Sequence, residues 1–197
     1  MADPRAAPHR TVAPPQSGGL RIPIVSALGR GQTPISSFDD ALRRCGVHNY
    51  NLIALSSVIP PRSEIVPAAY CARPPEEFGD RLYVVKADAR ASEPGSIVAA
   101  GIGWQQWQDG RGVFVETEMV ERRGSCATVQ RALTAHLQAA LRDLCVVRDV
   151  AYAEERGGTR VIVGQVGALP TTALVLAVYR AERWRAAVPI ESRESQP

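Results

Sequence analysis

Residues 81–148 read RLYVVKADARASEPGSIVAAGIGWQQWQDGRGVFVETEMVERRGSCATVQRALTAHLQAALRDLCVVR, and this stretch decides the fold. β-Branched and aromatic residues recur in three of its segments, at 81–91, 95–107 and 112–122. The pairs Pro94-Gly95 and Asp109-Gly110 separate these segments, and such pairs are typical of turns between strands. The pattern predicts three consecutive strands in an antiparallel meander.

A long helix is expected to follow the third strand. Ser125 is a suitable N-cap, and apolar residues recur after it at helical spacing. They form a single stripe of Val129, Leu133, Leu137, Leu141 and Leu144. We expect the stripe to pack on the sheet. Gly101-Ile102-Gly103 is too short for a dinucleotide-binding loop and indicates a bulge or a close-packing point.

The rest of the chain supplies further strands and one more helix. We expect a strand at 20–29, a short amphipathic helix at 36–45 capped by Ser or Asp, a buried strand at 49–57, and strands at 159–167 and 172–181. Pro60-Pro61 must stop the third of these elements. Strands and helices segregate without a βαβ repeat, which predicts the α+β class with helices layered against mainly antiparallel sheets.

Composition indicates a globular protein. The chain has 197 residues, 45% of them hydrophobic and 22% charged, with a net charge of +3. We expect one domain at 20–188 between a flexible arm at 1–19 and a flexible tail at 189–197. The mild charge argues against a nucleic-acid partner. No apolar run reaches the roughly 18 residues of a membrane span, so we expect no membrane partner and a cytoplasmic location.

Few residues suit metal or lysine chemistry. The four cysteines show no C-x-x-C spacing, and only three histidines could join them, so we expect no metal site and a reducing compartment. Lys86 is the single lysine, and a lysine-bound cofactor could rest on that residue alone. Its place in a strand-like run makes a solvent-exposed strand position the simpler interpretation.

Two adjacent serines, Ser56 and Ser57, end the strand at 49–57. On composition alone they are turn-forming hydroxyl residues at a strand end. A second interpretation gives them chemistry, because the Ser57 hydroxyl could attack the Ser56 carbonyl if tertiary strain held the two in line. Spacing does not decide between these interpretations.

The segment around the serines carries a family resemblance. Residues 38–61, FDDALRRCGVHNYNLIALSSVIPP, resemble the signature of the pyruvoyl-dependent arginine decarboxylases. That signature is F-D-x-A-L, a short helix ending in glycine, N-x-N-L and S-S-I-x-P-P. The likeness continues through Ala68-Ala69-Tyr70, the Gly101-Ile102-Gly103 strand and GVFVE at 112–116, and covers residues 22–148.

The resemblance implies a proenzyme that cleaves itself between Ser56 and Ser57 and converts Ser57 into a covalent pyruvoyl cofactor. The products are a β chain, residues 1–56, and an α chain that begins at 57. The pyruvoyl ketone forms a Schiff base with the amine of the substrate and acts as the electron sink while the carboxylate leaves.

The resemblance also assigns roles to individual residues. It makes Glu116 the proton donor, with Glu118 on the same strand face as its rival. It gives Asn51 the task of orienting the scissile carbonyl or the cofactor, although a bond to a neighbouring turn explains Asn51 equally well. It makes Asp39 the receptor of a substrate guanidinium. Asp39 also suits the first turn of a helix, and neighbouring Asp40 could replace it.

These implications predict an αββα sandwich that assembles as a trimer of αβ units and decarboxylates L-arginine to agmatine. His48 and the stretch at 117–123 depart from the family pattern, which bears on the substrate more than on cleavage. Two alternatives remain open. One is an uncleaved homologue with a binding or regulatory role, and the other is a decarboxylase for a different amino acid.

Overall fold

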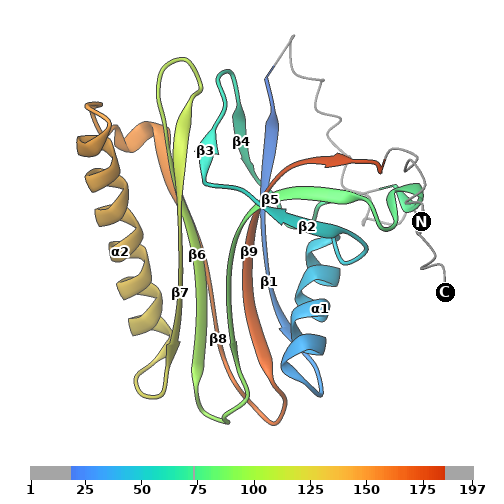
Figure 1. Cartoon of the computed structure of the whole chain (residues 1–197). Helices are drawn as coiled ribbons and strands as arrows, with labels where there is room; N and C mark the ends of the chain where they lie inside the picture. The colour runs from blue at the N-terminus through green and yellow to red at the C-terminus, as the bar shows by residue number, and fades with distance from the viewer. Residues whose placement is uncertain (1–18, 73, 185–197) are drawn as a thin grey trace, which may run out of the picture.

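The computed structural model describes residues 19–184 except Arg73. The expected arm at 1–19, apart from Gly19, and the expected tail at 189–197 lie outside the described residues. Two helices, α1 (Pro34–Cys45) and α2 (Cys126–Val147), cover the outer faces of two sheets. Figure 1 shows the resulting layers, helix, sheet, sheet and helix. The predicted α+β sandwich is therefore confirmed.

Nine strands form the two sheets of the described chain. Sheet A has the order β2 (Asn51–Ala54), β5 (Arg81–Ala91), β9 (Thr171–Glu182), β1 (Arg21–Arg30) and β4 (Glu64–Pro67). Sheet B has the order β3 (Val58–Ile59), β7 (Gly112–Glu121), β6 (Ile97–Gln106) and β8 (Gly157–Gln165). The pairs β1–β4 and β2–β5 are parallel and the others are antiparallel. Two short 3-10 helices complete the elements, at Pro75–Glu77 and Glu154–Arg156.

The predicted three-strand meander is only partly right. β6 pairs with β7, but β5 lies in the other sheet, between β2 and β9. Small and branched residues on the inner face of β5, including Ala87, pack against residues of β6, including Ala100, across the sandwich. The turn at Pro94-Gly95 therefore carries the chain from one sheet to the other, because both strands have an apolar face to bury.

Helix α1 begins one turn earlier than its predicted Ser or Asp cap. The N-cap is Thr33, whose side chain accepts a hydrogen bond from the Ser36 amide, and Ser36 completes the capping box. Gly46 ends the helix at φ 84. The helix packs closely on β1 at Gly29, where an added Cβ would meet the Ser37 carbonyl oxygen at 2.1 Å.

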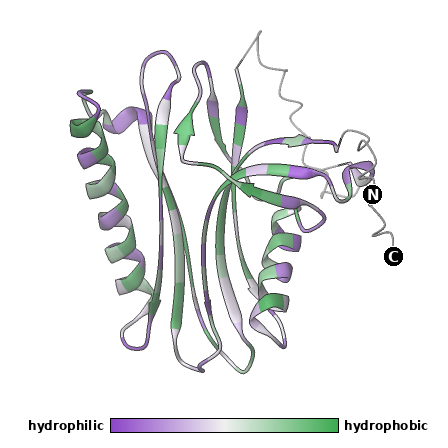
Figure 2. Ribbon diagram, viewed as in Figure 1, coloured by the Kyte–Doolittle hydropathy of each residue, from purple (hydrophilic) through white to green (hydrophobic). Residues whose placement is uncertain are grey.

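Helix α2 follows the prediction closely. Ser125 caps it, and the stripe is buried at Val129, Leu133, Leu137 and Leu141, with Cys145 in place of the half-buried Leu144. Figure 2 shows the alternating hydrophobic and hydrophilic bands of an amphipathic helix. A Cβ at Gly101 would lie 2.8 Å from Leu137 Cδ1, and one at Gly103 would lie 3.0 Å from Leu141 Cδ1. The Gly-Ile-Gly run is therefore a close-packing point for α2.

The predicted buried strand at 49–57 is shorter and more exposed than expected. β2 ends at Ala54 and is an edge strand with three of its four residues exposed. The next strand along the chain, β3, belongs to the other sheet.

No helix of the described residues is long and apolar enough to cross a bilayer.

Candidate active site

The serine pair lies where the chain crosses from one sheet to the other. The Leu55 amide donates to the Val84 carbonyl oxygen of sheet A at 2.9 Å. Three residues later, Val58 is paired with Val113 of sheet B. The Ser56–Ser57 bond therefore joins two segments that are fastened to different sheets, which limits how far its atoms can relax.

Ser57 has a left-handed backbone. Its φ is 64, and among the described residues only Arg62 and Asp149 are other non-glycine residues with positive φ. This conformation is unfavourable for a residue with a Cβ and costs on the order of 1 kcal/mol or more. The Ser57 carbonyl oxygen accepts a hydrogen bond from the Phe114 amide at 2.8 Å, so the strained residue is fastened to β7.

The Ser57 hydroxyl contacts a carboxylate. Its Oγ donates to Glu116, lying 2.8 Å from both Oε1 and Oε2. Along β7, Phe114 faces the space between the sheets, and Glu116 follows two residues later on the same face. The arrangement places a base beside a hydroxyl nucleophile at hydrogen-bonding distance.

Glu118 occupies the next position on the same face of β7, opposite Ala100 of β6. Among the described residues, the Ser57 hydroxyl bonds to Glu116 and not to Glu118. Both glutamates are exposed in the single chain. The single chain therefore buries neither carboxylate.

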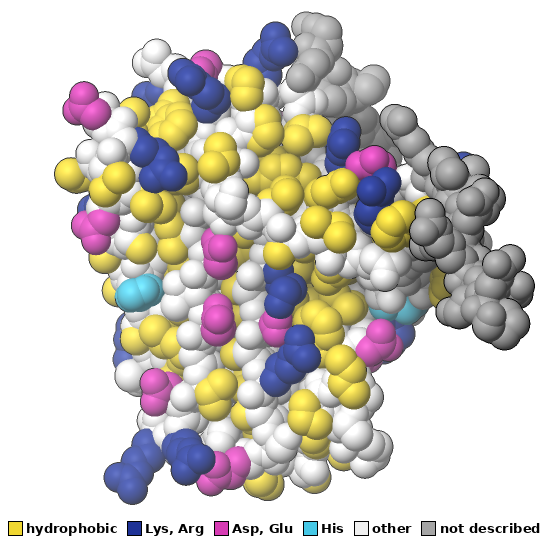
Figure 3. All heavy atoms as spheres, in the orientation of Figure 1, with side chains coloured by type: hydrophobic (Ala, Val, Ile, Leu, Met, Phe, Trp, Pro, Cys, Tyr) yellow, Lys and Arg dark blue, Asp and Glu magenta, His cyan; other side chains and the backbone are white. Residues whose placement is uncertain are grey.

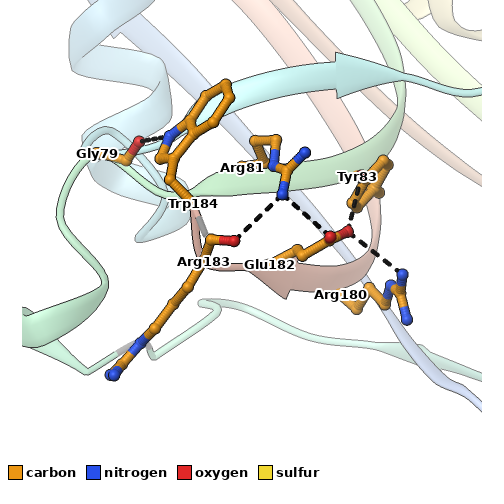
Figure 4. Close-up of polar contacts among 7 residues, drawn as sticks. All are labelled: Gly79, Arg81, Tyr83, Arg180, Glu182, Arg183 and Trp184. Carbon is orange, nitrogen blue, oxygen red and sulfur yellow. Dashed lines mark hydrogen bonds and ion pairs between the residues drawn. The ribbon is translucent and has the colours of Figure 1, made fainter. Parts of the chain in front are cut away.

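Asn51 lies apart from the serines, at the far end of β2. Its Nδ2 donates to the Gly79 carbonyl oxygen at 2.6 Å. The same oxygen accepts a hydrogen bond from Trp184 Nε1 at 3.0 Å, and Figure 4 shows the indole approaching it. The Trp184 ring also stacks on Arg81, which is bonded to Glu182. The local interpretation of Asn51, a bond to a neighbouring turn, describes its geometry in this chain.

The two aspartates of α1 differ in their contacts. Asp40 accepts hydrogen bonds from Arg43 at 2.7 Å, Arg44 at 2.8 Å and the Arg30 amide at 3.0 Å. Burial acts to raise the pKa of Asp40, but the hydrogen bonds from Arg44 and Arg43 outweigh it and lower the pKa to about 2. Asp39 is exposed, and of the two aspartates only Asp40 forms ion pairs within the described part of the chain.

The layers separate Asp39 from the serines. Helix α1 covers the outer face of sheet A, whereas Glu116 lies on the inner side of sheet B. One copy of the chain therefore brings Ser57 and Glu116 together and leaves Asn51 and Asp39 elsewhere.

The face of the molecule drawn in Figure 3 carries interspersed acidic and basic side chains and no single basic patch.

Sequence reasoning missed two groups that contact the serine segment. The first is the Phe114 amide, a backbone donor that no sequence pattern reveals. The second is Tyr179 of β9, whose hydroxyl donates to the Val58 carbonyl oxygen at 2.9 Å. A buried tyrosine in an apolar strand needs a hydrogen-bond partner, and this was the only available signal. A pocket of about 740 Å³ beside Trp107 and Arg148 is lined by neither serine.

Comparisons with known proteins identify a family. The sequence profile of the family described as pyruvoyl-dependent arginine decarboxylase matches residues 21–183. Proteins named pyruvoyl-dependent arginine decarboxylase are similar to this chain. The one from Methanococcus vannielii is 31% identical over 117 residues, 57% of this chain and 66% of that protein. The one from Halobacterium salinarum is 36% identical over 96 residues, 49% and 59% of the two chains.

A third relative, from Methanocaldococcus jannaschii, is 34% identical over 84 residues, 41% of this chain and 46% of that protein. The chain thus spans less than two thirds of the length of the curated relatives it matches. The profile match nevertheless takes in both helices and every strand of the two sheets. The chain belongs to the pyruvoyl-dependent arginine decarboxylase family.

Proposed function

We propose that this chain is a self-processing decarboxylase that converts L-arginine to agmatine and CO2 with a pyruvoyl group made from Ser57. The observation that carries the proposal is the contact of the Ser57 hydroxyl with both oxygens of Glu116. The left-handed φ of 64 at Ser57 supports it, because strain at a bond that must break raises the ground state toward the transition state.

The cleavage needs only groups at the crossing and one water molecule. Ser57 Oγ attacks the Ser56 carbonyl carbon and passes its proton to Glu116, and the C–N bond breaks as the amine takes up a proton. The resulting ester loses the Ser57 α-proton and releases Ser56 as a carboxylate. The dehydroalanine left at 57 takes up water and releases ammonia, which leaves a ketone at the head of the second chain.

The residues around position 57 fit a pyruvoyl group. When present, that group supplies an electron sink for loss of the substrate carboxylate. The Phe114 amide donates to the carbonyl oxygen of residue 57 at 2.8 Å, and a fixed donor at an oxygen where negative charge develops stabilises that charge. Glu116 holds a proton beside the reacting atoms and delivers it to the substrate α-carbon.

The substrate and the assembly are part of the same proposal. Asp39 receives the guanidinium group, for which a carboxylate offers two parallel hydrogen bonds. Because α1 lies in a different layer from Glu116, Asp39 must reach the reacting centre of another copy. The exposure of Glu116 in the single chain supports this, since a second copy would bury it. We propose a trimer with sites between subunits, in which Asn51 also comes from a neighbouring copy.

Intact mass spectrometry of the denatured protein tests the proposal. We expect two chains that meet between Ser56 and Ser57, with the second lighter by one ammonia than its serine-headed form. Ser57→Ala should stay whole. The cleaved protein should release CO2 from carboxyl-labelled arginine and form agmatine. A parent chain that remains whole after long incubation would favour the uncleaved binding homologue, and cleavage without turnover of arginine would favour another amino acid.

A further inference from the structure

Tyr179 occupies an irregular position in sheet A. β9 pairs with β5 in regular antiparallel register, but Val178 lies opposite Val84 and Arg180 lies opposite Tyr83. Tyr179 is therefore the extra residue of a β-bulge. Bulges re-aim a side chain and are over-represented beside active sites, so the direction of the Tyr179 side chain needs an explanation.

The side chain of Tyr179 connects the two sheets at the chain crossing. It belongs to sheet A, yet its hydroxyl donates to the carbonyl oxygen of Val58 in sheet B at 2.9 Å. Its ring meets that of Phe114 edge-on, with centroids 6.2 Å apart. The residue is 8% exposed, so this hydrogen bond is shielded from water and its loss would leave an acceptor unpaired.

Two contacting residues thus hold two consecutive carbonyls. The Phe114 amide holds the carbonyl of Ser57, and the Tyr179 hydroxyl holds the carbonyl of Val58. β3 itself is only two residues long. After cleavage position 57 becomes a chain end, and chain ends fray unless they are tied down. The hydrogen bond from Tyr179 is then one of the few contacts that hold this chain end in place.

We propose that Tyr179 is a positioning residue that fixes residue 57 against Glu116, both for the attack on Ser56 and in the cleaved protein; the inference rests on the self-processing function proposed above. It acts through the Val58 carbonyl and touches no reacting atom. Burial, followed by the negative charge of Glu116, raises the pKa of Tyr179 above its ordinary value. The phenol therefore stays protonated and keeps its role as a donor.

Tyr179→Phe tests the inference, since it removes the hydroxyl and leaves the ring against Phe114. Tyr83→Phe is the matched control, because Tyr83 lies across the bulge and its hydroxyl bonds to Glu182 instead. Cleavage of freshly translated chains is followed by intact mass. Losing a shielded hydrogen bond should slow cleavage of Tyr179→Phe by about tenfold or more, and Tyr83→Phe should stay within about twofold of the parent.

Two further readouts separate positioning from general destabilisation. Urea unfolding should show that Tyr179→Phe and Tyr83→Phe are both fully folded under the assay conditions, so that slower cleavage reflects the local geometry and not unfolding. Once cleaved, Tyr179→Phe should show a lower kcat per pyruvoyl-bearing chain. Its KM for arginine should stay near the parent value, because the substitution does not change the residue proposed to bind the guanidinium group. Cleavage and kcat at the parent level would overturn the inference alone. A parent that is never cut would overturn the proposed function and the inference with it.

Discussion

Replacing Glu116 with Gln separates two roles that the geometry allows, holding the Ser57 hydroxyl and removing its proton. The hydroxyl donates to a carboxylate 2.8 Å away. A hydrogen bond to a charged group is worth roughly 1.5–3 kcal/mol and one to a neutral group roughly 0.5–1.5. The difference, about 1–1.5 kcal/mol, slows a reaction by about tenfold. A general base contributes about a further 10²–10⁴.

We therefore expect self-cleavage of Glu116→Gln to slow by at least about 100-fold. Glu118→Gln is the matched control, because Glu118 lies on the same face of β7 without bonding to Ser57. Chains made in a cell-free translation system are sampled over time, and the uncleaved and cleaved forms are quantified by intact mass spectrometry. A loss of only about tenfold would show that Glu116 holds the hydroxyl without taking its proton. A larger loss in Glu118→Gln would refute the assignment altogether.

Three other changes have defined outcomes. The lowered pKa of Asp40 contributes stability that is present above its unfolded pKa of 3.8 and is lost as pH falls toward about 2; Asp40→Asn should remove this pH dependence and cost about 1 kcal/mol at neutral pH, measured by urea unfolding. Gly101→Val places a Cβ 2.8 Å from Leu137 Cδ1 and should cost about 1–3 kcal/mol in the same assay. Asp39→Ala should leave cleavage intact and raise KM for arginine at least about tenfold in steady-state assays, because a charged hydrogen-bond partner of the guanidinium is lost.

The elements with strong local signals could be predicted from the sequence. Helix α2 matches its predicted cap and stripe because Ser125 and the leucine spacing act within the helix itself. The close-packing interpretation of Gly101 also holds, since a Cβ there would lie 2.8 Å from Leu137 Cδ1. These features depend on neighbours a few residues apart or on the size of one side chain.

The features that depend on tertiary contacts could not be predicted. The sheet that holds β5 is decided by pairing with β9, about ninety residues away in sequence, and local alternation carries no such information. The N-cap of α1 is Thr33 and not the predicted Ser or Asp, because Ser36 lies inside the helix and completes a capping box with Thr33. The bulge at Tyr179 and the amide of Phe114 depend on register, which side-chain identity does not encode.

The position of the serine pair would allow the proposed cut without separating the two chains. The segment before the cut supplies β1, α1 and β2. In sheet A, β1 lies between β4 and β9, and both of these strands belong to the segment after the cut. Seven residue pairs join β1 to β9, and α1 packs on both strands. Breaking the Ser56–Ser57 bond would therefore free only the two ends at the crossing. The first end would remain bound through Leu55 to sheet A and the second through Phe114 to sheet B, so the proposed ketone would stay beside Glu116.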